Sequence, residues 1–66
     1  MSINKENLMT YANNLFNNAI SLNKLNVIPS IEHAKSLLSE NKVAYGEILK
    51  ILNNVSNQLK NSIQFK

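Results

Sequence analysis

Histidine and glutamate are the side chains of this sequence best suited to proton transfer. His33 is the single histidine, and four glutamates accompany it at positions 6, 32, 40 and 47. A general base needs a positioned partner that orients its ring. Glu32 adjoins His33, so in a helix the two side chains point in different directions, and Glu40 lies too far along the chain. We therefore expect His33 to be a surface residue.

Metal sites, phosphate loops and activated nucleophiles are equally hard to assemble from these residues. The chain has no cysteine, and the glutamates do not share a helical face with His33 at the spacing that metal ligands need. A single glycine, Gly46, excludes a glycine-rich phosphate loop. The serines have no base nearby in the sequence. We expect a protein that is not an enzyme and that uses no metal or cofactor.

Length and charge narrow the class of protein further. The chain has 66 residues and a net charge of +3, with neither arginine nor aspartate. This charge permits weak attraction to nucleic acid, but arginine, the best residue for contacting phosphates and guanine edges, is missing. No apolar run reaches the roughly 18 residues of a membrane span, and no secretion signal is evident. We expect one domain, residues 1–66, in the cytoplasm.

Apolar residues recur with the period of amphipathic helices in three segments. The segments run from about Lys5 to Leu22, from Ile31 to Leu38 and from about Val43 to Ile63. The sequence therefore predicts an all-α fold, a small three-helix domain with two long amphipathic helices and a short middle helix. We expect the long helices to be antiparallel or crossed. Because so small a domain is marginally stable, a dimer or a partner could complete its core.

Residues with capping preferences predict where the first two helices begin. Ser2 or Asn4 is a suitable N-cap for the first helix. Pro29 disfavours helical geometry at Ile28. Ser30 is therefore the expected N-cap of the second helix, with Glu32 placed to complement the helix dipole.

The other helix ends are predicted in the same way. Asn23 would turn into the apolar arc of the first helix, so we expect that helix to end near it. Ser39 or Asn41, in the polar connection SENK, is the expected cap of the third helix. Gly46 lies inside that helix and costs about 1 kcal/mol relative to alanine. It fits either a frayed first turn or a close helix crossing.

Asparagine is the commonest residue of the chain, at thirteen positions. In YANNLFNNAI, residues 11–20, two asparagine pairs alternate with apolar pairs. On a helix, most of these amides lie opposite the apolar arc, and the third helix repeats the pattern with Asn53, Asn54, Asn57 and Asn61. These amides are either a solvated outer face that reflects a biased composition or a hydrogen-bonding surface for a partner.

Helical spacing also predicts which apolar residues are buried and which flank the core. The predicted core consists of Leu8, Ala12, Leu15, Phe16, Ala19, Ile31, Ala34, Leu38, Ile48, Leu52, Val55, Leu59 and Ile63. The apolar residues expected to flank it, and to bind another protein or a second copy of the chain, are Tyr11, Ile20, Tyr45, Leu49 and Ile51.

Residues 37–63 resemble the helix-turn-helix region of small winged-helix repressors. The similarity lies in Leu37-Leu38-Ser39-Glu40, then Tyr45-Gly46-Glu47-Ile48, then Val55-Ser56. The resemblance implies a turn after Leu52 and then a recognition helix, whose asparagines could read adenine. Here the apolar spacing continues through that position without a break.

A second resemblance is to small helical bacteriocin immunity proteins. The similarity lies in the spacing of the apolar residues in IEHAKSLL, residues 31–38. A polar turn and a leucine-rich helix follow this sequence, as in those proteins. The segment between the first helix and these residues is shorter than in that family, and a fourth helix is missing.

These observations predict a non-catalytic protein-binding module that acts through apolar helix faces. Inhibitors, immunity factors, antitoxins and secretion chaperones are proteins of this kind. The alternative is a small DNA-binding transcriptional regulator with a degenerate helix-turn-helix. A helix lying on a membrane surface is less consistent with the third segment, because its polar face is mostly uncharged and it lacks tryptophan.

Overall fold

The chain folds into three α-helices and one short 3-10 turn. The computed structural model describes the backbone of residues 3–63 and the side chains of residues 3–60. The helices are α1 (Lys5–Ser21), α2 (Ile28–Glu40) and α3 (Tyr45–Ile63), and the 3-10 turn η1 (Leu25–Val27) leads directly into α2. Residues 3–63 contain no strand. The predicted all-α fold with three helices is confirmed.

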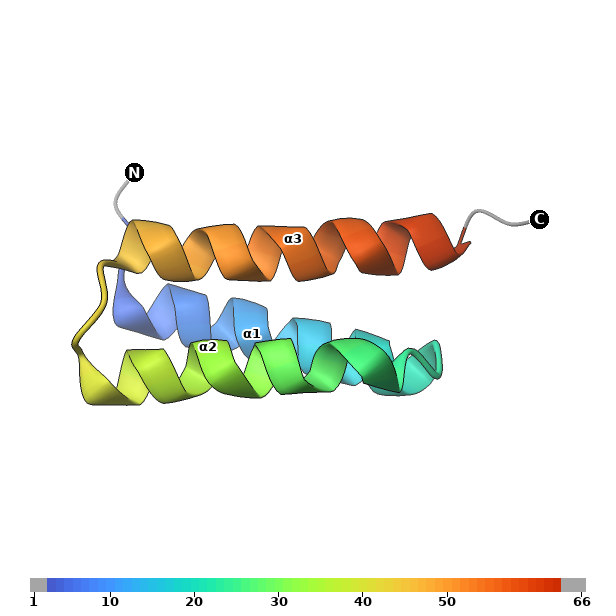
Figure 1. Ribbon diagram of the computed structural model, residues 1–66, viewed down its shortest axis with the longest axis horizontal. Coiled ribbons are helices and arrows are strands. Elements are labelled where there is room, and N and C mark those ends of the chain that lie inside the picture. Colours follow the sequence, from blue (N-terminus) through green and yellow to red (C-terminus); the bar gives the residue numbers. More distant parts are fainter. Residues whose placement is uncertain (1–2, 64–66) are drawn as a thin grey trace.

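The helices run up, down and up, so α1 and α3 are parallel (Figure 1). The prediction that the two long helices are antiparallel or crossed is therefore wrong. Short connections force each helix to return alongside the preceding one, so α2 is antiparallel to both neighbours. Each helix contacts the other two, and the molecule measures 39 × 23 × 15 Å.

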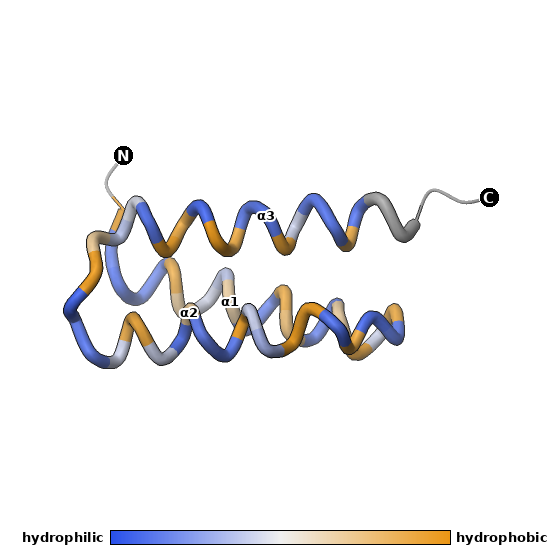
Figure 2. The backbone as a smooth tube through the Cα atoms, in the orientation of Figure 1, coloured by the Kyte–Doolittle hydropathy of each residue, from blue (hydrophilic) through white to orange (hydrophobic). Residues whose placement is uncertain are grey.

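The core is built from one apolar stripe of each helix, and hydrophobic positions of α3 recur on the side facing α1 and α2 (Figure 2). Among the described side chains, the buried hydrophobic residues are Leu8, Ala12, Leu15, Ala19, Val27, Ile31, Ala34, Leu38, Ile48, Leu52, Val55 and Leu59. Eleven of them were predicted. The exception is Val27, which lies in the connection where no helix was expected.

Two further residues predicted for the core, Phe16 and Ile63, are not among these buried residues. Phe16 is only half-buried, because it lies on the flank of α1 that faces α2. The Nζ atom of Lys35 lies 5.5 Å from the centroid of its ring, within the range of a cation–π contact. Ile63 lies outside the described side chains.

Asparagines flank the first helix at both ends. The side chain of Asn4 accepts a hydrogen bond from the backbone N–H of Asn7 at 2.8 Å, so of the two predicted N-caps, Ser2 and Asn4, the cap is Asn4. At the other end Asn23 has a φ of 58°. The N–H of Asn23 donates to the carbonyl of Ile20, and that of Lys24 donates to the carbonyl of Ala19. This is a Schellman motif, which satisfies the last carbonyls and stops the helix.

The second helix is longer than predicted, with thirteen residues. Ile28 is helical, with φ −57° and ψ −45°, although Pro29 follows it. Pro29 lies in the first turn, where its missing N–H breaks no helical hydrogen bond. Ser30 is therefore inside the helix and is not its N-cap. That position belongs to Val27, which makes no side-chain cap.

The connection from α2 to α3 also differs from the prediction. Ser39 is inside α2, and Asn41 ends α2 in the left-handed conformation, so neither caps α3. The backbone carbonyl of Ala44 accepts from Glu47 and Ile48, and α3 begins two residues later than expected. Gly46 lies in this first turn, and a Cβ added to it would meet nothing within 4 Å. A close helix crossing is therefore not the reason for this glycine.

Candidate partner-binding site

The five predicted partner-binding residues do not form one surface. Tyr11 is half-buried, and its hydroxyl donates a 2.7 Å hydrogen bond to Oδ1 of Asn53. Leu49 and Tyr45 lie one and two turns before Asn53 on the same face of α3, and both pack against the core. Tyr11 therefore belongs to the junction of α1 and α3, whereas Leu49 and Tyr45 are partly covered by the core.

The other two predicted residues lie elsewhere. Ile51 packs against the core beside a shallow cavity between α2 and α3. Ile20 lies near the end of α1, and 53% of its side chain is exposed. Of the five, Ile20 alone is a large aliphatic residue open to solvent. Their partner-binding role stays a prediction.

Exposed large hydrophobic residues gather instead at one end of the bundle. Of four such residues among the described side chains, Ile20, Leu22 and Leu25 lie within six positions of the sequence, where α1 ends and η1 begins. The fourth, Ile3, precedes α1 at the opposite end. We call Ile20, Leu22 and Leu25 the apolar end. Leu22 and Leu25 were missed because the segment SLNKLN has a polar composition, although two leucines in a connection were a usable signal.

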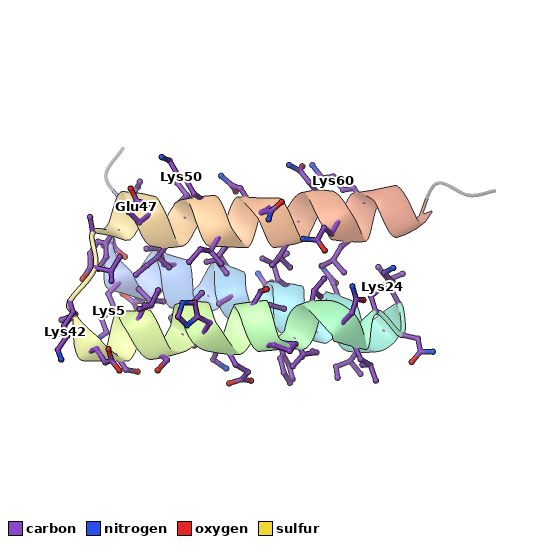
Figure 3. The ribbon with its side chains drawn as sticks, in the orientation of Figure 1. Lys5, Lys24, Lys42, Glu47, Lys50 and Lys60 are labelled. Carbon is purple, nitrogen blue, oxygen red and sulfur yellow. The ribbon has the colours of Figure 1, made fainter. Side chains whose placement is uncertain are left out.

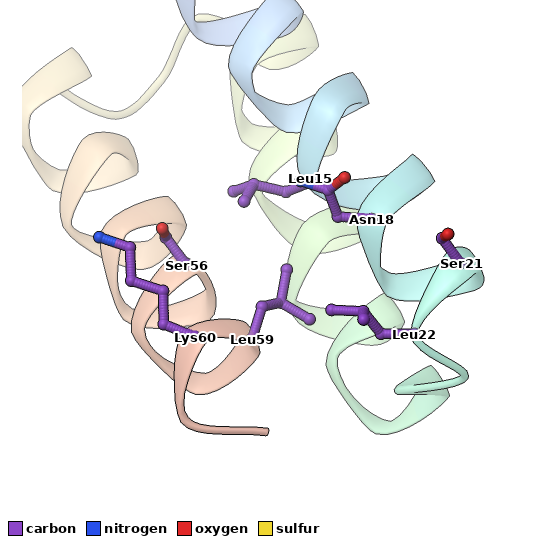
Figure 4. A pocket seen from close by; sticks show the side chains of 7 residues that line it. All are labelled: Leu15, Asn18, Ser21, Leu22, Ser56, Leu59 and Lys60. Atoms are coloured by element: carbon purple, nitrogen blue, oxygen red, sulfur yellow. The ribbon is translucent and has the colours of Figure 1, made fainter. Parts of the chain in front are cut away.

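A groove between α1 and α3 opens next to the apolar end (Figure 4). Its volume is about 300 Å³, and it is lined by Leu15, Asn18, Ser21, Leu22, Ser56, Leu59 and Lys60. Leu22 and Leu59 point toward each other across it (Figure 4). The lining therefore combines aliphatic side chains, neutral polar groups and one cation. We call it the α1–α3 groove.

The one charged side chain that lines this groove, Lys60, is a cation. After Glu6, α1 carries no acidic residue, and after Glu47 neither does α3. Lys60 lies beside the groove, and Lys24 lies at the same end of the bundle (Figure 3). A carboxylate that approaches this end of the α1–α3 surface therefore meets cations and neutral amides.

His33 lies in a different place, as a lining residue of the cavity between α2 and α3. The other lining residues are Ser30, Lys50, Ile51, Asn54 and Val55, with no carboxylate among them. His33 is exposed, as expected from the sequence. Within the described residues, no three histidine, cysteine or acidic side chains come together as a metal site.

The asparagine faces point outward, as the helical spacing predicted. Asn13, Asn14, Asn17 and Asn18 of α1 are exposed, and so are Asn53, Asn54 and Asn57 of α3. Asn61 lies outside the described side chains. Asn53 differs from the others, because its amide oxygen accepts a hydrogen bond from the Tyr11 hydroxyl.

The turn implied by the winged-helix resemblance is absent. Helix α3 runs without interruption through Leu52. Helices α2 and α3 are antiparallel neighbours (Figure 1), whereas the two helices of a helix-turn-helix meet at about 90–120°. Across residues 3–63, no helix combines the length and apolar character needed to cross a membrane.

No protein-family model, no curated protein and no solved structure matches this sequence. The function must therefore be inferred from the surface of the chain itself, and the apolar end and the α1–α3 groove are its most distinctive features.

Proposed function

We propose that this chain is a non-catalytic protein-binding module that contacts its partner through the apolar end. The observation that carries the proposal is that three of the four exposed large hydrophobic residues among the described side chains, Ile20, Leu22 and Leu25, lie at one end of the bundle, with 53%, 39% and 55% exposure. Single exposed hydrophobic residues are common on protein surfaces, whereas grouped ones mark interaction sites.

The composition of the core supports a binding role for the apolar end, because the core is complete without these exposed residues. Each helix already supplies a stripe of buried side chains to the interior, and Ile20 and Leu25 are not part of the core cluster. Burying them against a partner would remove exposed apolar surface from water, worth roughly 25 cal/mol per Å². Inhibitors, immunity factors, antitoxins and secretion chaperones all work by occupying a partner in this way.

The test is a pull-down from the native host with a double variant, Ile20→Ser and Leu25→Ser. The wild-type chain should capture one protein at stoichiometric yield, and the double variant should lose it. Both side chains are more than half exposed, so the variant should keep the helical circular dichroism of the wild type.

Ile3→Ser is the matched control, because it removes an exposed isoleucine at the other end of the bundle. It should capture the partner as well as the wild type does. Failure of the wild-type chain to capture any stoichiometric protein would count against the proposal. Equal losses in both variants would place the contact elsewhere.

A DNA-binding regulator is a second proposal, and it has one favourable observation. Lys50, Asn53, Asn57 and Lys60 follow one another at helical spacing on α3 and are all exposed. Such a surface predicts affinity for duplex DNA that falls steeply as salt rises. Replacing all four residues by alanine should abolish that affinity, and binding that persists would exclude this surface.

A further inference from the structure

We propose that the α1–α3 groove receives an acidic amphipathic helix of the partner protein, which packs beside α1 and α3 as a fourth helix. This inference rests on the proposed function, since it requires that the chain binds a protein. It adds the place, the secondary structure and the charge of the segment that is bound.

The shape of the groove favours a helix as its occupant. The groove lies between the last two turns of α1 and the facing part of α3, and no residue of α2 lines it (Figure 4). Helices pack by placing the side chains of one into the groove of another, and an amphipathic helix in an apolar groove is a common mode of peptide recognition. Leu22 is 39% exposed at its edge, so it is available to an incoming aliphatic side chain.

The charges select an acidic helix over a basic one. The lining contains Lys60, the neutral groups of Asn18, Ser21 and Ser56, and no carboxylate. Neither α1 beyond Glu6 nor α3 beyond Glu47 carries an acidic residue that could repel an anion. Charge complementarity of this kind selects partners and suppresses those of the wrong sign.

The parallel arrangement of α1 and α3 also predicts the direction of the bound helix. Both helices end next to the groove, and the last turn of α1 contains no basic residue to offset its negative end. A bound helix antiparallel to both, as α2 is on the other side, brings its positive N-terminal end to this place. Acidic residues, which are favoured in the first turn of a helix, would then lie close to Lys60.

The experiment uses two synthetic helical peptides with identical leucine positions. One carries glutamates beside the leucines, and the other carries lysines at the same positions. Each is titrated into the full-length ¹⁵N-labelled chain at low salt while amide chemical shifts are recorded. The glutamate peptide should shift the amides of Asn18, Leu22 and Ser56, and it should bind at least about tenfold more tightly than the lysine peptide.

Two charge-reversal variants make the test specific. Lys60→Glu should abolish this roughly tenfold preference for the glutamate peptide. Lys42→Glu makes the same change in the α2–α3 connection, at the opposite end of the bundle (Figure 3), and should leave the preference intact. Both lysines are exposed, and thermal melts should show that both variants fold.

Several results would overturn the inference. These are equal binding of the two peptides, chemical shifts that map outside the groove, or an equal effect of the two lysine variants. Shifts of the groove amides that grow with protein concentration alone would assign the groove to a second copy. The same shifts produced more strongly by anionic vesicles or by duplex DNA would assign it to those ligands.

The two proposals can fail separately. If the native host yields a partner that depends on Ile20 and Leu25 while the peptides show no preference, the protein-binding function stands and the acidic helix is wrong. If no partner is captured and no peptide binds, both proposals fail.

Discussion

The hydroxyl of Tyr11 joins two helices at positions that are 42 residues apart in the sequence. It donates to Oδ1 of Asn53 on α3 at 2.7 Å. This hydrogen bond is exposed, and a bond of this kind contributes about 0.5–1 kcal/mol net. Asn53 therefore has a structural role on a helical face whose other asparagines point to solvent.

Removing this hydroxyl should destabilise the fold slightly. Tyr11→Phe keeps the ring and loses the hydrogen bond, so the free energy of unfolding should fall by about 0.5–1 kcal/mol in urea titrations. Tyr45→Phe is the matched control, since Tyr45 is also half-buried and its hydroxyl forms no hydrogen bond with the described residues. Equal effects of the two changes would show that the Tyr11–Asn53 bond contributes nothing.

At the scale of the helices, asparagine occurs at two kinds of position, at helix ends and on exposed helical faces. Asn23 and Asn41 have a φ of 58° at the ends of α1 and α2, a conformation that costs most L-residues about 1–2 kcal/mol. Asn13 and Asn57 lie on exposed helical faces, where asparagine is a poorer helix former than alanine.

The same substitution should therefore have opposite effects at these two kinds of position. Asn23→Ala and Asn41→Ala should each lower the free energy of unfolding by about 1 kcal/mol. Asn13→Ala and Asn57→Ala should each raise it by about 0.5 kcal/mol. Chemical denaturation of the four variants measures both effects, and a stabilising change at Asn41 would contradict the role of its left-handed conformation.

Gly46 offers a stabilising change in the first turn of α3. A Cβ there meets nothing within 4 Å, and the φ of Gly46 is not positive. Gly46→Ala should raise the free energy of unfolding by about 0.5 kcal/mol, because alanine loses less backbone entropy than glycine. A lower melting temperature would mean that the turn needs the freedom of glycine.

At the scale of the whole molecule, stability depends on one small core shared by three helices. Ile31, Leu38, Ile48 and Leu52 are fully buried. A domain of this length has a net stability of roughly 3–10 kcal/mol, and it has no disulfide to add to that. The loss of one large core side chain is therefore a large fraction of the total.

Leu52→Ala should cost about 2–5 kcal/mol and leave the chain partly or wholly unfolded. Leu25→Ala is the comparison, because 55% of Leu25 is exposed, and its effect should be below about 0.5 kcal/mol. Thermal melts followed by circular dichroism measure both. Similar losses would show that the apolar end belongs to the core and is not free for a partner.

The sequence by itself determined the features that depend on one helix at a time. The period of the apolar residues predicted three helices and, among the described side chains, eleven of the twelve buried hydrophobic positions, because burial of a stripe follows from helical geometry. Asn4 was one of two caps predicted from residue preference, with Ser2, and its amide reaches the backbone N–H of Asn7 within one turn. The outward direction of the asparagines followed from the same periodicity.

Only the tertiary structure decided the features that depend on contacts between elements. The burial of Val27 against its neighbours accompanies the early start of α2, which the local preference of a residue before proline opposes. The parallel direction of α1 and α3 depends on how the two connections between the helices fold back. The spacing of the apolar residues gives no information about it. The α1–α3 groove exists only once these helices lie side by side, because it is lined by residues that are distant in the sequence.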